Sequence, residues 1–137
     1  MPAPTAAEVA EYAARRARLL AAIGPNNVAI VPSAREVIRN RDAHYRFRQD
    51  SDFLYLSGFN EPDSMLVLVP GRQAGEFLMF VRARDAAREI WDGRRAGPEG
   101  AVSVYGAGQA FVIGDFEKQL HELLAGRNRI FLTGGED

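Results

Sequence analysis

The sequence predicts an α/β domain in which a mixed β-sheet is flanked by helices. Three observations support this: a helical pattern near the start, a pair of apolar strands in the middle, and a second helical pattern followed by a short apolar run near the end. Helices and strands in this order pack as layers around one core. With 137 residues, the chain is expected to form one domain over residues 1–137.

The first element is a helix over residues 5–23. Thr5 and Glu8 form a capping box, in which the hydroxyl and the carboxylate each satisfy a free amide at the helix start. Apolar residues then recur at helical spacing. Gly24 and Pro25 end the helix, because proline cannot continue it.

Three short apolar runs are predicted to be strands. Residues 28–31 form a β-branched run that reads as a buried strand. Residues 65–69 and 77–81 flank the turn-forming residues 70–75, so we expect an antiparallel hairpin. Residues 33–48 show no period that supports an element.

The remainder is predicted as a long loop, a helix and a final strand. Residues 82–114 are rich in glycine and charge and indicate a loop with one helical turn at residues 86–90. Asp115 is expected to cap a helix that Gly126 closes, followed by a strand over residues 130–132. The apolar face of this helix consists of Phe116, Leu120, Leu123 and Leu124.

Composition excludes several classes of function. A net charge of −1 gives no global attraction to nucleic acid or anionic lipid. The absence of cysteine excludes disulfides and thiolate metal sites. Charges interrupt residues 1–22, so no signal peptide is expected, and the apolar runs are far shorter than the roughly 20 residues that cross a bilayer. We therefore expect a cytoplasmic protein without membrane contact.

The sequence contains no recognisable catalytic constellation. His44 and His121 have no metal-ligand spacing, and no serine lies in a nucleophile elbow. The loop at residues 106–108 is interpreted as a flexible turn rather than a phosphate cradle. A further alternative is a metal-dependent nuclease, because four acidic residues could bind two divalent ions. They are Asp50, Asp52, Glu61 and Asp63.

Two further groups of residues could contact a partner. A basic stretch interleaved with aromatics could follow a nucleic-acid backbone, but nearby acids cancel most of its field, so ion pairing at the surface or between subunits is favoured. It contains Arg35, Arg39, Arg41, Tyr45, Arg46, Phe47 and Arg48. Trp91 lies beside a glycine and two arginines, and both core anchoring and partner contact are open for it.

Residues 45–62 (YRFRQDSDFLYLSGFNEP) mix aromatic and charged residues in a pattern of neither helix nor strand, which indicates a loop. This block, the strand at 65–69, the block EIWDGRR at 89–95 and the helix at 116–124 follow one another in order. Together they resemble the N-terminal domain of aminopeptidase P, in the creatinase and prolidase family. The resemblance implies the creatinase N-terminal fold with its ribonuclease-H-like topology.

The resemblance also implies where the chemistry would occur. Family enzymes remove the N-terminal residue that precedes proline, using two manganese ions held by two Asp, one His and two Glu of a C-terminal domain with the pita-bread fold. This chain contains none of that domain and ends before the family's N-terminal domain is complete. We therefore expect no catalytic residue and no metal ligand in it, and no activity from the chain alone.

By the same resemblance, some residues are expected to shape the substrate cleft or to mediate assembly. Trp91 would form a wall of the cleft, commonly that of a neighbouring subunit in a homo-oligomer, with Arg94 and Arg95 holding its loop or pairing with acidic groups. Phe53, Tyr55 and Phe59 are expected to pack in the core or at a domain interface. The alternative function is a stand-alone oligomerisation or binding module without peptidase activity.

Overall fold

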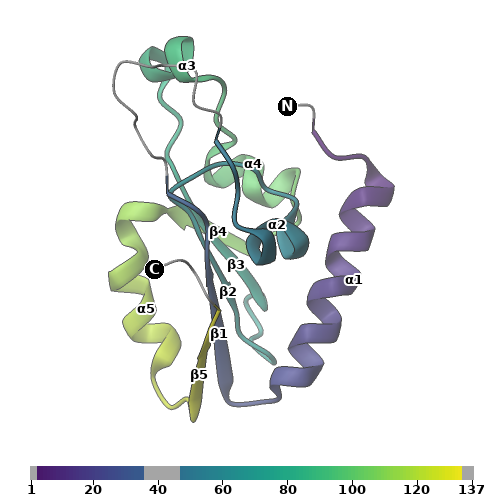
Figure 1. Cartoon of the computed structure of the whole chain (residues 1–137). Helices are drawn as coiled ribbons and strands as arrows, with labels where there is room; N and C mark the ends of the chain where they lie inside the picture. The colour runs from purple at the N-terminus through teal and green to yellow at the C-terminus, as the bar shows by residue number, and fades with distance from the viewer. Residues whose placement is uncertain (1–2, 36–46, 134–137) are drawn as a thin grey trace.

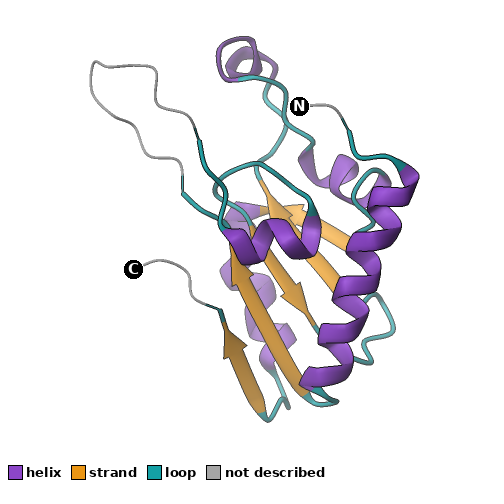
Figure 2. Cartoon of the chain, turned by 45° about the vertical axis from the view of Figure 1, so that its right-hand side comes forward, coloured by secondary structure: helices purple, strands orange, loops and turns teal. Residues whose placement is uncertain are grey.

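The computed structural model describes residues 3–35 and 47–133. Five strands form one sheet in the order β4-β3-β2-β1-β5. Helices cover both faces: α1 and α2 lie on one side of the sheet and α5 on the other (Figures 1 and 2). The predicted α/β class with a mixed sheet and flanking helices is confirmed.

Helix α1 (Ala6–Ile23) begins at the predicted capping box. The Thr5 amide donates to Glu8 Oε1 at 2.8 Å, and the Glu8 amide donates to Thr5 Oγ1 at 3.1 Å. Gly24 ends the helix with a φ of 84°, in the region that favours glycine. These signals are local in sequence, which is why sequence alone could place this helix.

The sheet has an antiparallel centre and parallel outer strands. Strands β1 (Asn27–Pro32), β2 (Met65–Leu68) and β3 (Phe77–Val81) pair antiparallel, which confirms the predicted hairpin. Strand β4 (Gln109–Val112) pairs parallel to β3, and β5 (Arg129–Leu132) pairs parallel to β1.

Alternate residues of the strands supply two separate apolar clusters. In β1, Ala29 and Val31 belong to the cluster on the side of α1 and α2. Val28 and Ile30 belong to the cluster covered by α5 (Phe116–Leu124). The predicted apolar face of α5 is confirmed, since Leu123 is buried and its three partners pack against the same cluster.

The prediction of a long loop over residues 82–114 is wrong. It contains α3 (Ala86–Asp92), α4 (Gly97–Ser103) and β4; the expected helical turn is part of α3. Each element has seven residues or fewer, too short for a periodic pattern to emerge from sequence. The expected side-chain cap of α5 is also absent: a 3-10 turn (Ile113–Asp115) precedes α5, and Asp115 makes no capping hydrogen bond.

Residues 45–62 also contain a helix that the sequence pattern did not predict. Helix α2 (Ser51–Ser57) begins where Asp50 Oδ2 accepts a hydrogen bond from the Phe53 amide at 3.0 Å, and Gly58 ends it in the left-handed conformation. Only Phe53, Leu56 and Ser57 are buried. The other side chains of the helix are not, so the sequence shows a mixture of apolar and polar residues instead of a clear helical period.

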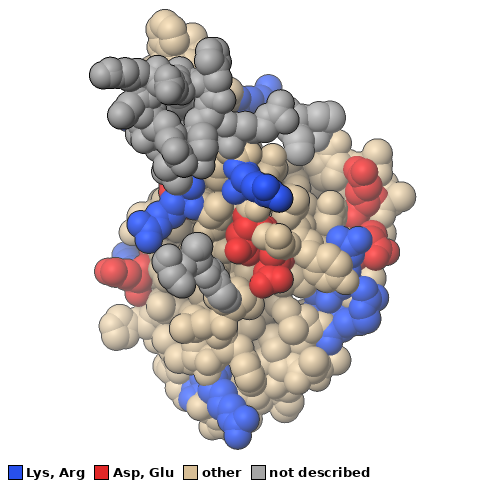
Figure 3. Space-filling model, viewed as in Figure 1, with Lys and Arg blue, Asp and Glu red and all other residues tan. Residues whose placement is uncertain are grey.

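Most of the basic stretch considered for nucleic-acid binding, and His44, lie outside the described residues. On the face drawn in Figure 3, positive and negative side chains are interspersed. Within residues 3–35 and 47–133, no helix is long and apolar enough to cross a membrane.

Candidate functional site

The most exposed large apolar side chains of the described chain lie on α3. Residues 82–96, which we call the α3 projection, connect β3 to α4 and extend away from the sheet (Figure 1). Ile90 is 77% exposed and Trp91 is 86% exposed. Trp91 therefore does not anchor the core of this chain. Of the two interpretations that the sequence left open, core anchoring and partner contact, only partner contact is compatible with this position.

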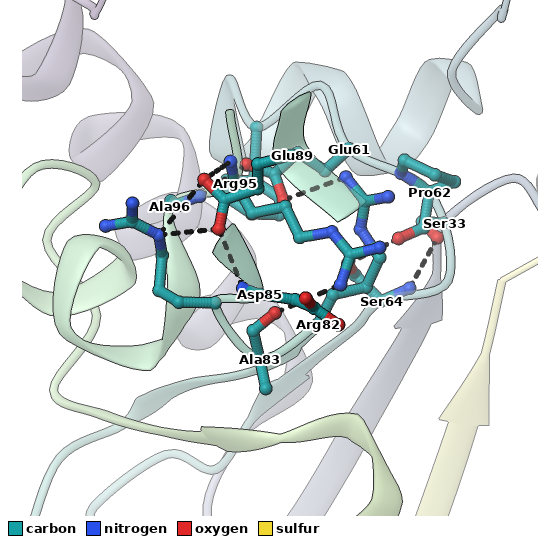
Figure 4. A network of polar contacts seen from close by, with 12 residues as sticks. Ser33, Glu61, Pro62, Ser64, Arg82, Ala83, Asp85, Glu89, Arg95 and Ala96 are labelled. Atoms are coloured by element: carbon teal, nitrogen blue, oxygen red, sulfur yellow. Dashed lines mark hydrogen bonds and ion pairs between the residues drawn. The ribbon is translucent and has the colours of Figure 1, made fainter. Parts of the chain in front are cut away.

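Glu89 joins the two ends of this projection. Its Oε2 accepts a hydrogen bond from the Asp85 amide at 2.7 Å, and its Oε1 accepts one from the Arg95 amide at 3.0 Å. The Arg84 Nε donates to both oxygens, at 3.2 and 3.0 Å. One carboxylate thus holds backbone from before and after the helix (Figure 4).

Glu61, from the loop between α2 and β2, makes a second junction between the two ends of the projection. Its Oε2 accepts from the Ala96 amide at 2.9 Å, and its Oε1 accepts from Arg82 Nη2 at 3.3 Å (Figure 4). Gln49 fixes this loop, because its buried side-chain amide donates to the carbonyls of Phe59 and Glu61.

The two arginines of the EIWDGRR block have different positions. Arg95 Nη1 donates to the Ala83 carbonyl at 3.1 Å, again joining the end of the projection to its start. Arg94 is exposed. A loop-holding contact is therefore present for Arg95.

The electrostatics of Glu89 match a structural role. Hydrogen bonds from the Arg84 side chain and then from the amides of Arg95 and Asp85 lower the pKa of Glu89 to about 2. The same pairing raises the pKa of Arg84. A carboxylate that is ionised at neutral pH and fully engaged by donors is not suited to proton transfer.

The aromatic residues of the 45–62 block divide between core and surface. Phe53 and Phe59 are completely buried, with ring centroids 6.4 Å apart. Tyr55 is 52% exposed, and the Arg15 guanidinium lies over its ring at 4.3 Å. Tyr55 thus lies on the outer side of α2 and not in the core, and packing at a domain interface, the other position expected for it, stays a prediction.

The acidic residues considered for a nuclease are not gathered into a site. Asp50 caps α2, Glu61 holds the α3 projection, and Asp52 and Asp63 are exposed. Among the described residues, no three Asp, Glu or His side chains lie close enough to hold a metal ion. The nuclease alternative therefore lacks the carboxylate cluster on which it depended.

Sequence reasoning missed the residues that hold the projection: Gln49, Glu61, Arg82, Arg84 and Glu89. Glu89 carried a usable signal, since it lies four residues after Asp85 and six before Arg95. Glu61 carried none, because its partner Ala96 is 35 residues away.

The described residues thus combine a mixed five-stranded sheet with an exposed projection whose base is held by polar contacts. The family model of the aminopeptidase P N-terminal domain matches residues 12–131. The chain belongs to this family, and the resemblance read from sequence is confirmed.

The relatives are aminopeptidases of much greater length. The chain is 37% identical over 127 residues to the Xaa-Pro aminopeptidase of Escherichia coli, covering 92% of this chain and 29% of that protein. It is 38% identical over 133 residues to human Xaa-Pro aminopeptidase 3, covering 88% of this chain and 26% of that protein. The chain thus spans less than a third of these relatives.

Solved structures show the same fold. Aminopeptidase PepP of Pseudomonas aeruginosa superposes with a TM-score of 0.88 at 50% identity, over 94% of this chain and 29% of that chain. Aminopeptidase P of E. coli with the inhibitor Pro-Leu gives a TM-score of 0.85 at 36% identity, over 94% of this chain and 30% of that chain.

Proposed function

We propose that this chain is the non-catalytic N-terminal domain of a manganese-dependent Xaa-Pro aminopeptidase, and that it shapes the substrate cleft and supports assembly of a homo-oligomer. Family membership supports the parent activity, since the relatives carry that name. The observation that supports the cleft role is the exposed Trp91 on a braced projection. Because contacts at the base already hold the backbone of the projection, less conformational freedom is lost when Trp91 contacts a partner.

The substrate proposal rests on the relatives. The E. coli protein binds the inhibitor Pro-Leu, and the substrate proposed here is a peptide with proline at its second position. Trp91 would contribute an apolar wall to the peptide cleft, and the catalytic domain would supply the chemistry.

The described residues do not fit a site for the two manganese ions. Glu61 and Glu89 are occupied by donors of this chain, and no metal-ligating cluster is present in residues 3–35 and 47–133. The ions would be bound by the C-terminal catalytic domain. A cytoplasmic location remains a prediction from sequence.

Replacement of Trp91 tests the cleft role in the full-length enzyme. We expect Trp91→Ala to raise KM or lower kcat for short Xaa-Pro peptides by roughly tenfold, the scale of losing an aromatic anchor at an interface. Trp91→Phe, which keeps a ring, should retain most activity. Steady-state kinetics and circular dichroism are the measurements. Wild-type kinetics with Trp91→Ala would contradict the proposal.

The second candidate is a stand-alone oligomerisation or binding module, favoured by the exposed apolar residues of β5 as well as by Trp91. Assay of the 137-residue chain with Mn²⁺ and an Xaa-Pro peptide, together with sedimentation, examines both candidates. Turnover by this chain alone would contradict both. Loss of Xaa-Pro hydrolysis when this domain is deleted from a longer enzyme would favour the first.

A further inference from the structure

The α3 projection must be held by something other than its own helix or the burial of its large apolar side chains. Helix α3 has seven residues, and isolated helices shorter than roughly 12–15 residues are marginal in water. Its two large apolar side chains, Ile90 and Trp91, point into solvent. Polar contacts at its base are therefore the interactions available to order it.

Those contacts form two carboxylate junctions. The first is Glu89, whose side chain is only 9% exposed and which joins residues 84 and 85 to residue 95. The second is Glu61, which joins residue 82 to residue 96. Figure 4 shows both carboxylates between the chain segments that enter and leave α3.

Helix geometry links the orientation of Trp91 to that of Glu89. Successive residues of an α-helix are about 100° apart around the axis, so a residue two positions later lies on nearly the opposite side. With Glu89 directed into the base of the projection, Trp91 is directed away from it. The direction of the indole therefore depends on where the Glu89 carboxylate is held.

We infer that Glu89 is a positioning residue, which closes the base of the α3 projection and thereby fixes the direction in which Trp91 is presented. The kinetic consequence rests on the proposed function, in which Trp91 lines a peptide cleft.

Glutamine is an informative replacement because it keeps the size of the side chain. The carboxylate accepts from three donor groups through two oxygens. An amide retains one acceptor and turns an N–H toward a backbone N–H, so Glu89→Gln should lose one side of the junction. Glu99→Gln is the matched control, because Glu99 is exposed on α4 and acts on Arg84 only through its charge.

Trp91 is the only tryptophan of the chain, so its fluorescence reports on the projection. In the 137-residue chain, we expect Glu89→Gln to add fast motion to the Trp91 anisotropy decay. Amide hydrogen exchange should become about tenfold faster or more over residues 85–96 and stay unchanged in β1–β3, since the lost contacts are local. Glu99→Gln should behave as wild type.

Unchanged anisotropy and exchange in Glu89→Gln would overturn the inference, as would equal changes in Glu99→Gln. Faster exchange throughout the sheet would also overturn it, because Glu89 would then be a general stability determinant. If Glu89→Gln fails to fold, Arg84→Gln decides: it removes the side-chain donor to both oxygens and should loosen residues 85–96 in the same direction but less. No loosening in Arg84→Gln would then overturn the inference.

Double-mutant kinetics in the full-length enzyme separate this inference from the proposed function. If Glu89 acts through Trp91, Glu89→Gln lowers kcat/KM by up to the roughly tenfold loss expected for Trp91→Ala, because it misplaces the same binding group. It then has no further effect in a Trp91→Ala background. An equal loss in both backgrounds would overturn the coupling. If Trp91→Ala itself changes nothing, the proposed function fails, while fluorescence and exchange still decide the role of Glu89.

Discussion

Neighbouring aromatic residues of one short segment have opposite environments. Phe53 is buried between α1, α2 and the sheet, while Tyr55, two positions later, lies on the outside of α2. Their spacing in a helix places them on different sides. The same position was predicted for both residues because the sequence pattern did not reveal the seven-residue helix α2.

Alanine replacements should separate the two. Phe53→Ala should lower the free energy of unfolding by about 3–5 kcal/mol, the cost of deleting a buried aromatic ring. Tyr55→Ala should cost about 1 kcal/mol or less, because its ring is half exposed and loses mainly a cation–π contact with Arg15. Urea denaturation of both variants measures this. Equal losses would contradict the assignment of Phe53 to the core and of Tyr55 to the surface.

At the scale of the elements, two arginines of α1 donate hydrogen bonds to the carbonyls at the C-terminal end of α2. The last carbonyls of a helix lack intrahelical donors and favour positive charge. Helix α2 has no basic residue in its last turn, but Arg15 Nη1 donates to the Tyr55 carbonyl at 3.0 Å and Arg16 Nη1 donates to the Leu56 carbonyl at 2.8 Å. Arg16 also lies over the Phe77 ring at 3.8 Å, and burial lowers its pKa to about 10.

This predicts an unusual stability contribution from one arginine of α1. Arg16→Ala should cost about 2–3 kcal/mol, since it leaves the buried end of α2 without a charged donor. Arg18→Ala, on the exposed side of the same helix, should change stability by less than about 0.5 kcal/mol. Thermal and urea unfolding provide the comparison; similar values for the two variants would contradict this role of Arg16.

At the scale of the whole molecule, β5 is an exposed edge strand of the sheet. It pairs with β1, and Ile130, Phe131 and Leu132 are 49%, 42% and 70% exposed. An apolar strand at a sheet margin is a template for pairing with another chain.

We therefore expect the 137-residue chain to self-associate through β5. Leu132→Lys should shift it toward monomer, because a charged side chain blocks pairing at the margin. Ile90→Lys places the same substitution on α3 and should leave association through β5 unchanged. Sedimentation velocity over a range of concentrations is the measurement. Association that survives Leu132→Lys and disappears with Ile90→Lys would assign the contact to α3 instead.

Sequence alone determined the features whose causes are local or periodic. The capping box of α1, the apolar runs of β1, β2 and β3, and the leucines of α5 each depend on residues a few positions apart. The blocks at residues 45–62 and 89–95 also identified the family and directed attention to Trp91.

Only the tertiary structure decided how those blocks work. Helices α2 and α3 and strand β4 are too short to show a period, and their stability comes from distant partners such as Arg16 on α1. Glu61 meets Ala96 only because β2 and β3 bring their segments together. Such contacts depend on the three-dimensional path of the chain, so the residues that hold Trp91 in place became visible only in the folded molecule.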